Sequence, residues 1–165
     1  METSVFYNFP LVAMLSGWMA AQVVKLLLYA VKERRFDYGF LLRLGGMPSS
    51  HSASAGACTT AIGLVAGWHT VSFAIAAGMM FLIMVDAQGV RHAAGQQARL
   101  LNQMAAEFYR ERKVRPQRLL EFLGHTRKEV FVGAVLGVAI ALALWYGCPG
   151  WSQHWAAGAA GAVAP

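Results

Sequence analysis

The chain has 165 residues, of which 57% are hydrophobic and only 13% are charged, and its mean hydropathy is +0.44. So few charges cannot cover the surface of a soluble domain of this length, and the composition therefore predicts an integral membrane protein. The net charge of +6 raises the question of a nucleic-acid partner, but the placement of the basic residues described below argues against one.

Four long apolar runs are each close to the roughly 20 residues that cross a bilayer. They cover residues 9–31, 52–68, 71–87 and 130–147. We therefore expect an all-α fold, a polytopic membrane bundle of about four transmembrane helices. A single membrane-embedded domain is expected over residues 1–150, followed by an external Ala/Gly-rich tail without regular structure over residues 151–165.

The basic residues lie in two loops that share one side of the membrane. Of the 14 Lys and Arg residues, four lie in residues 32–43, nine lie in residues 91–128, and Lys25 lies inside the first run. By the positive-inside rule both loops are cytoplasmic and both chain termini are external. The first run is long and carries a lysine, which argues against a cleaved signal peptide. The expected location is the inner membrane of a bacterium, with the bilayer as the main partner.

Lys25 lies six residues before the end of the first run, which is about 9 Å of helix rise inside the boundary. Two interpretations are open for a lysine at this depth. It can snorkel to the membrane surface, or it can point into a polar pocket.

The stretch Gly45-Gly46-Met47-Pro48-Ser49-Ser50-His51-Ser52-Ala53 joins the first basic loop to the second apolar run. It places two hydroxyls and an imidazole at the start of a helix. Unpaired backbone N–H groups and the positive end of the helix dipole attract phosphate there. The stretch therefore predicts an anion site.

The third run ends with Asp86, and Arg91 follows five positions later at the cytoplasmic boundary. A salt bridge at the membrane edge is one interpretation, and a direct role in chemistry is the other. Residues 93–112 then show the pattern of an amphipathic helix, which we expect on the inner membrane surface.

His125 and Glu129 stand four residues apart at the start of the fourth run, so they share one helix face. The carboxylate could accept a hydrogen bond from one ring nitrogen and leave the other to act as a nucleophile or base. On the expected topology this pair, His51, Asp86, Arg91 and Lys25 all lie at the same depth. Together they are the parts needed for phosphoryl transfer without a metal ion or other cofactor.

Two of these segments also carry a resemblance to a known superfamily. Pro48-Ser49-Ser50-His51 resembles the Pro-Ser-Gly-His motif of the type 2 phosphatidic acid phosphatase and vanadium haloperoxidase superfamily, and His125-x3-Glu129 resembles the His-x3-Asp end of its third motif. The wider pattern, with Asp86-Ala87-Gln88-Gly89-Val90-Arg91 and Gly124-His125-Thr126, is similar to the divergent, membrane-bound branch of that superfamily.

The resemblance implies a role for each matching residue. His125 would be the nucleophile that forms a phosphohistidine, Glu129 would orient it in place of aspartate, and His51 would be the general acid and later the base. Ser49 and Ser50 would donate to phosphate, and Lys25 would match the lysine of the first motif. The superfamily acts without a metal ion.

The sequence departs from the superfamily pattern in three places. Lys32 stands where the first motif has arginine, Glu33 stands where it has proline, and Leu119 stands where the third motif has arginine. Arg118 is one position off, about 100° around a helix, so Arg91 is the preferred phosphate ligand, with Asp86 and Arg118 as supporting residues. Four spans are also fewer than the usual six, so a homodimer or the surface helix is expected to complete the pocket.

The expected function is that of a membrane-embedded phosphatase for a lipid phosphate at the cytoplasmic face. A phosphatidylglycerophosphate, a phosphatidate and a polyprenyl (di)phosphate all fit as substrate. The alternative is a lipid-phosphate transporter or flippase that binds the headgroup without breaking it. A third interpretation is a structural membrane subunit, in which the charged residues are salt-bridge partners of one another.

Overall fold

The computed structural model describes residues 8–34, 46–110 and 126–161. These residues form helices and no strands, so the expected all-α fold is confirmed for them. The helices are α1 (Phe9–Glu33), α2 (Ser50–Ala66), α3 (Val71–Gln88), α4 (Val90–Arg110), α5 (Arg127–Gly147) and α6 (Pro149–Gly161).

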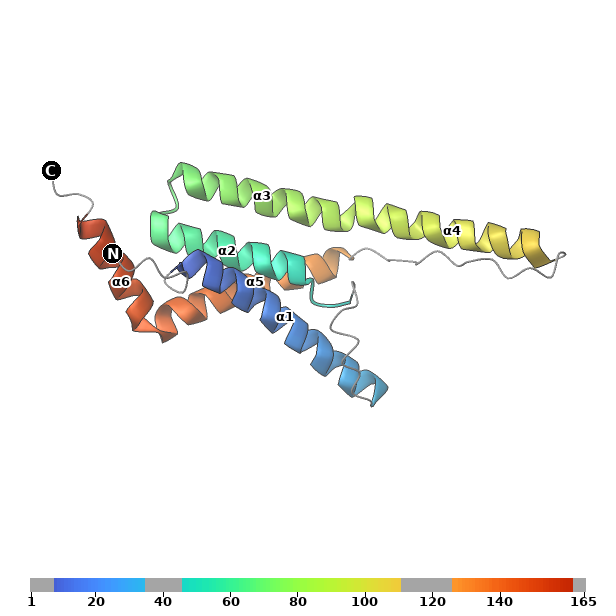
Figure 1. Ribbon diagram of the computed structural model, residues 1–165, viewed down its shortest axis with the longest axis horizontal. Coiled ribbons are helices and arrows are strands. Elements are labelled where there is room, and N and C mark those ends of the chain that lie inside the picture. Colours follow the sequence, from blue (N-terminus) through green and yellow to red (C-terminus); the bar gives the residue numbers. More distant parts are fainter. Residues whose placement is uncertain (1–7, 35–45, 111–125, 162–165) are drawn as a thin grey trace.

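The directions of the helices bring the expected site segments together. Helices α2 and α5 run parallel to each other, and α1 and α3 run in the opposite direction (Figure 1). The first turns of α2 and α5 therefore lie at the same end of the bundle as the last turn of α3. We call this the His51 end, and we call the opposite end, where α1 begins, the Phe9 end.

Three described helices are long and apolar enough to cross a membrane, over Phe9–Lys32, Val71–Gln88 and Arg127–Gly147. The remaining expected span corresponds to α2, which has 17 residues and falls short of that length. It is short because Ser49 caps its start and Gly67, with a φ of 99°, ends it. The expected helical membrane bundle is thus confirmed, with three of the four expected spans long enough to cross a membrane and α2 the shortest at 17 residues.

Helix α2 is the centre of the bundle, and glycines let its neighbours approach its backbone. A Cβ on Gly17 of α1 would lie 2.8 Å from the Ala53 carbonyl oxygen, and one on Gly137 of α5 would lie 2.8 Å from the Ala57 nitrogen. Contacts this close exclude any larger residue. Helices in lipid associate through such close packing, because apolar burial gives them little driving force.

Helix α3 is the outermost of the membrane-spanning helices. Thr59 Oγ1 on α2 donates to the Ala76 carbonyl oxygen at 3.2 Å and ties the two helices together. The other face of α3 exposes large apolar side chains, as expected of a helix in contact with lipid: Val71, Ile75, Met79, Phe81, Leu82 and Val85.

The expected amphipathic helix is present as α4, and it begins at Val90, three residues earlier than expected. Figure 1 shows α4 continuing the line of α3 away from the bundle. The backbone at Gly89 is helical, with φ −94° and ψ −77°, so the chain passes from α3 into α4 without a sharp turn. The position of α4 on the inner membrane surface stays a prediction.

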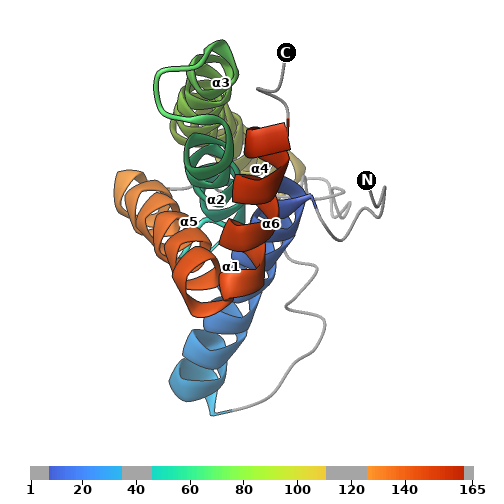
Figure 2. The ribbon, with the colours of Figure 1, turned by 90° about the vertical axis from the view of Figure 1, so that its left-hand side faces the viewer.

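The expectation of an unstructured tail after Pro149 was wrong. Residues Pro149–Gly161 form α6, which lies across the Phe9 end of the bundle (Figures 1 and 2). The fully buried ring of Phe9 lies 5.0 Å from the ring of Trp145 and 5.5 Å from that of Trp151. These aromatic contacts give α6 a packing partner, which composition alone did not reveal.

Candidate functional site

The first turn of α2 is built around the Ser49 side chain. Ser49 is the N-cap, and its Oγ accepts from the Ser52 backbone N–H at 3.4 Å and from the Ser52 hydroxyl at 3.1 Å. The residue is fully buried. Gly46, three residues earlier, has a φ of 85°, a conformation that favours glycine. The predicted helix start in this stretch is therefore confirmed, at Ser50.

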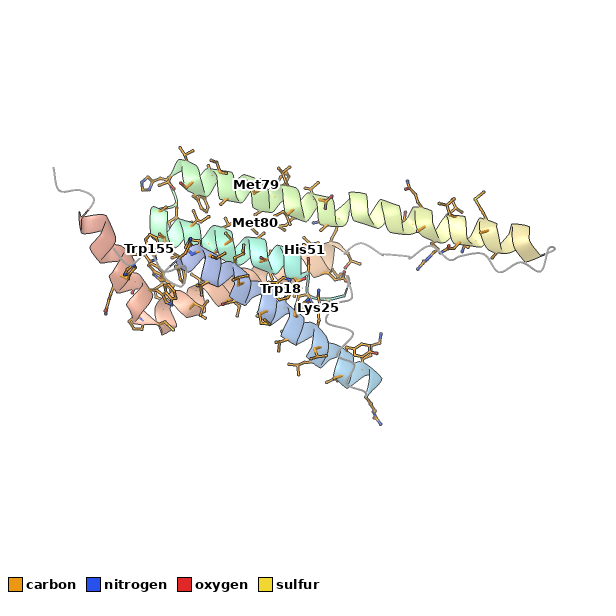
Figure 3. All side chains as sticks on the ribbon, viewed as in Figure 1. Trp18, Lys25, His51, Met79, Met80 and Trp155 are labelled. Carbon is orange, nitrogen blue, oxygen red and sulfur yellow. The ribbon has the colours of Figure 1, made fainter. Side chains whose placement is uncertain are left out.

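Lys25 reaches this first turn from α1. Its side chain is only 5% exposed, and its Nζ donates to Ser50 Oγ at 3.2 Å. Lys25 therefore points into the bundle toward a polar partner and does not snorkel to the membrane surface. Figure 3 shows Lys25 and His51 close to the same end of the bundle, on α1 and α2.

The start of α5 adds a carboxylate to the same end. Thr126 and Glu129 form a capping box, in which Glu129 Oε2 accepts from the Thr126 N–H at 3.0 Å and Thr126 Oγ1 accepts from the Glu129 N–H at 3.4 Å. The Glu129 carboxylate also attracts the Lys25 ammonium electrostatically. The sequence carried the signal for this cap in Thr126-x2-Glu129, but our sequence interpretation used Glu129 only as a partner of His125.

The backbone joins the two helix starts directly. The Ser49 N–H donates to the Glu129 carbonyl oxygen at 3.0 Å. Gly133, one turn into α5, makes room for this contact, because a Cβ there would overlap the Ser49 carbonyl oxygen. Two helix N-termini, each with the positive end of its dipole, therefore lie side by side.

The other expected site residues lie at exposed helix positions, on α4, or outside the described part of the chain. His51 is the second residue of α2 and is exposed, and Asp86 is exposed near the end of α3. Arg91 lies on α4, with its side chain outside the described part. His125 and Arg118 both lie outside the described residues. Lys32 is exposed, about 10 Å of helix rise beyond Lys25.

One polar residue of α1 was not singled out from the sequence. Gln22 is 9% exposed and precedes Lys25 by three residues, so the two side chains share one face of α1. The three-residue spacing between Gln22 and Lys25 is the feature of the sequence that could have predicted this shared face. Among the described residues, no three His, Cys, Asp or Glu side chains come together closely enough to hold a metal ion.

In addition to the Glu129 carboxylate, the His51 end assembles hydrogen-bond donors and positive charge. At the His51 end they include the Lys25 ammonium, the Ser50 hydroxyl, the His51 imidazole and the amides that helix geometry directs out of the first turn of α2. Such a set binds an oxyanion such as a phosphate group.

Comparison with known proteins identifies the family of the chain. Residues 6–140 match the profile of the divergent PAP2 family. The uncharacterized membrane protein YuiD of Bacillus subtilis (strain 168) is 36% identical over 150 residues, which cover 84% of this chain and 95% of that protein. No solved structure matches the chain. The family match includes α1, α2 and most of α5, and the chain belongs to the divergent PAP2 family.

Proposed function

We propose that this protein is a membrane-embedded phosphatase that removes phosphate from a lipid at the His51 end of the bundle. The observation that carries the proposal is the buried hydrogen bond from Lys25 to Ser50 at the start of α2, where the Glu129 carboxylate attracts the same ammonium electrostatically. A buried ammonium in a membrane protein is costly and is usually retained for function. Phosphatidate, phosphatidylglycerophosphate and polyprenyl (di)phosphate are the candidate substrates.

The proposed reaction has two steps and uses two histidines. A nitrogen of His125 attacks phosphorus, the bond from phosphorus to the lipid oxygen breaks, and His51 gives its proton to that oxygen. His51, now neutral, then removes a proton from water, which attacks the phosphohistidine and releases inorganic phosphate. Lys25 and the amides at the start of α2 stabilise the charge on the phosphoryl oxygens.

Glu129 has the capacity to serve both the helix and His125 in this proposal. The capping box uses one lone pair of Oε2. An ionised carboxylate accepts about four hydrogen bonds in total, so it can also accept one from the imidazole of His125, which directly precedes the cap residue Thr126. That bond would fix the ring tautomer that the nucleophile needs.

The cytoplasmic side is supported by the distribution of charge. Thirteen of the 14 Lys and Arg residues lie in two ranges of the sequence: residues 32–43, between α1 and α2, and residues 91–128, between α3 and α5. The positive-inside rule assigns such segments to the cytoplasm. The proposed substrate is therefore a lipid that presents its phosphate to the cytoplasm.

A transporter or flippase is the alternative, and the packing of the bundle favours the enzyme. Gly17 of α1 and Gly137 of α5 both bring their helices against the backbone of α2 at Ala53 and Ala57. A headgroup crossing between these three helices would have to separate them along this contact. Hydrolysis at the His51 end requires no such separation.

The test is phosphate release by the purified full-length protein in detergent, with chelator present, from a panel of the three candidate lipids. We expect release that vanadate inhibits and that His51→Gln and His125→Gln each abolish. His69→Gln is the matched control, because His69 is exposed at the turn between α2 and α3, at the opposite end. Headgroup binding without release from any lipid would overturn the phosphatase and favour the transporter.

A further inference from the structure

The two adjacent serines at the start of α2 are both buried, with Ser49 0% and Ser50 5% exposed, but their hydrogen bonds differ. Ser49 is 0% exposed and its Oγ accepts two hydrogen bonds from Ser52. Its backbone N–H is bonded to Glu129, and its carbonyl oxygen accepts from the Ala53 N–H at 3.0 Å. All of these contacts hold the helix start in place.

Ser50 instead receives its hydrogen bond from a charged group of another helix. Lys25 Nζ donates to Ser50 Oγ, so Ser50 is the acceptor in this pair. A hydroxyl has one hydrogen to donate as well as its two acceptor positions. The bond from Lys25 therefore leaves the Ser50 O–H hydrogen for another acceptor.

Helix geometry gives that hydrogen no partner within α2. A serine inside a helix commonly donates to the carbonyl three or four residues before it. Ser50 is the first residue of α2, so the residues at those positions, Gly46 and Met47, precede the helix. The Ser50 O–H is thus available at the helix end, together with the amides that point out of the first turn.

We propose that Ser50, held by Lys25, is the hydroxyl that contacts the phosphate, and that Ser49 is a structural cap. This inference rests on the proposed function of the same site. The superfamily resemblance implies that both serines donate to phosphate. The hydrogen bonds instead separate their roles, because Ser49 Oγ is used within the helix start and Ser50 is held by Lys25. Lys25 then acts as a positioning residue for Ser50 and adds positive charge beside the bound oxyanion.

The ligand that this arrangement recognises is a tetrahedral oxyanion. The Ser50 hydroxyl, the Ser50 and His51 amides and the N–H groups of Lys25 are all donors. A lipid phosphate and free inorganic phosphate share this chemistry. Orthovanadate has the same charge type and shape, so it serves as a probe of binding that does not depend on hydrolysis.

The experiment compares the same substitution at the two positions, Ser50→Gly and Ser49→Gly, in the full-length protein. Glycine is a good N-cap, so Ser49→Gly removes the hydroxyl at little cost to folding. For each variant, kcat and KM are measured with the lipid phosphate that the wild-type protein hydrolyses fastest. The rise in the unfolding midpoint on addition of orthovanadate or inorganic phosphate is measured as well. Lys25→Met and Ser50→Ala complete the set.

We expect Ser50→Gly, Ser50→Ala and Lys25→Met each to lower kcat/KM by about tenfold or more, the usual effect of losing a hydrogen bond to a charged group. The rise in midpoint with orthovanadate should be lost in the same variants. For Ser49→Gly, kcat/KM and the rise in unfolding midpoint with orthovanadate should each stay within about twofold of the wild type. Full activity of Ser50→Gly, or loss of activity and of vanadate binding in Ser49→Gly, would overturn the inference.

The same data separate this inference from the proposed function. If the wild type binds orthovanadate and loses that binding only with Ser50 substitutions, but hydrolyses no lipid, the assignment of Ser50 stands and the phosphatase proposal fails. If lipid is hydrolysed equally by Ser50→Gly and the wild type, the phosphatase stands and the assignment of Ser50 fails. Absence of both hydrolysis and binding would overturn both.

Discussion

The backbone N–H of Ser49 donates to the backbone carbonyl oxygen of Glu129 at 3.0 Å, and this bond joins the first turns of α2 and α5. It uses no side-chain atom, so it persists whatever side chains these two positions carry. Gly133 allows it by removing the Cβ that would occupy the same space. The two segments with the strongest superfamily motifs are therefore held together by the main chain.

The Thr126 cap should contribute measurably to stability. Thr126→Ala removes the hydroxyl that accepts from the Glu129 N–H, and loss of an N-cap typically costs about 1 kcal/mol. We expect a lower unfolding midpoint in detergent for Thr126→Ala. Thr126→Ser, which keeps the hydroxyl, should match the wild type, and equal losses in both variants would contradict the capping role.

The charges of Lys25 and Glu129 should be coupled. Glu129→Gln keeps a capping-box side chain but removes the negative charge that attracts Lys25, so it should destabilise the protein. In a Lys25→Met background the same substitution should cost less, by about 1 kcal/mol. The measurement is a double-mutant cycle of unfolding in detergent. Strictly additive effects would show that the two charges do not interact.

Gly137 should tolerate no side chain. A Cβ there would overlap the backbone of Ala53 on α2, and an overpacked core position costs about 1–3 kcal/mol because the backbone cannot easily move away. Gly137→Ala should therefore lower the unfolding midpoint clearly. Gly78→Ala on α3 is the matched control, since nothing lies within 4 Å of a Cβ at that position. It should be neutral or slightly stabilising, by up to about 1 kcal/mol.

The Phe9 end should depend on aromatic packing and not on the polar group of Trp155. Phe9 is fully buried against Trp145 and Trp151, so Phe9→Ala should cost about 3 kcal/mol or more. The Trp155 Nε1 is buried and has no hydrogen-bond partner among the described residues. Trp155→Phe should accordingly be neutral or stabilising in the same thermal assay, because it removes an unsatisfied donor.

The orientation in the membrane can be tested with cysteine labelling. Cys148 is exposed at the Phe9 end, and Lys128 is exposed at the His51 end. We expect a membrane-impermeant maleimide to label Cys148 in intact cells. In a Cys148→Ala variant, Lys128→Cys should be labelled only after the cells are made permeable. The reverse pattern would place the His51 end outside.

The sequence was sufficient to predict those parts of the site that are determined by the residue pattern within a single segment. The hydroxyl-rich start of α2 follows from Ser49 and Ser50 ahead of an apolar run, and the amphipathic character of α4 follows from its helical periodicity. The shared depth of the helix ends followed from the distribution of Lys and Arg, a property that depends on the membrane and not on individual contacts.

Features that depend on contacts between distant residues could not be read in this way. The burial of Lys25 requires the Ser50 hydroxyl, which lies 25 positions away in the chain. The order in α6 depends on Phe9 at the other end of the chain, and its Ala/Gly-rich composition gave no sign of that partner. The straight course from α3 into α4 depends on the backbone angles of Gly89, since glycine permits a turn as readily as a continuous helix.

The shortness of α2 affects the depth of the proposed reaction. Its 17 residues span about 26 Å, somewhat less than the roughly 30 Å hydrocarbon core of a bilayer. A helix of this length with its Gly67 turn at one headgroup level would place its first turn slightly beneath the other. A lipid would reach Ser50 by sinking a short way into the bilayer, with its tail in the hydrocarbon throughout. In the proposed reaction the dephosphorylated lipid then stays in the membrane, and inorganic phosphate is the product that leaves for water.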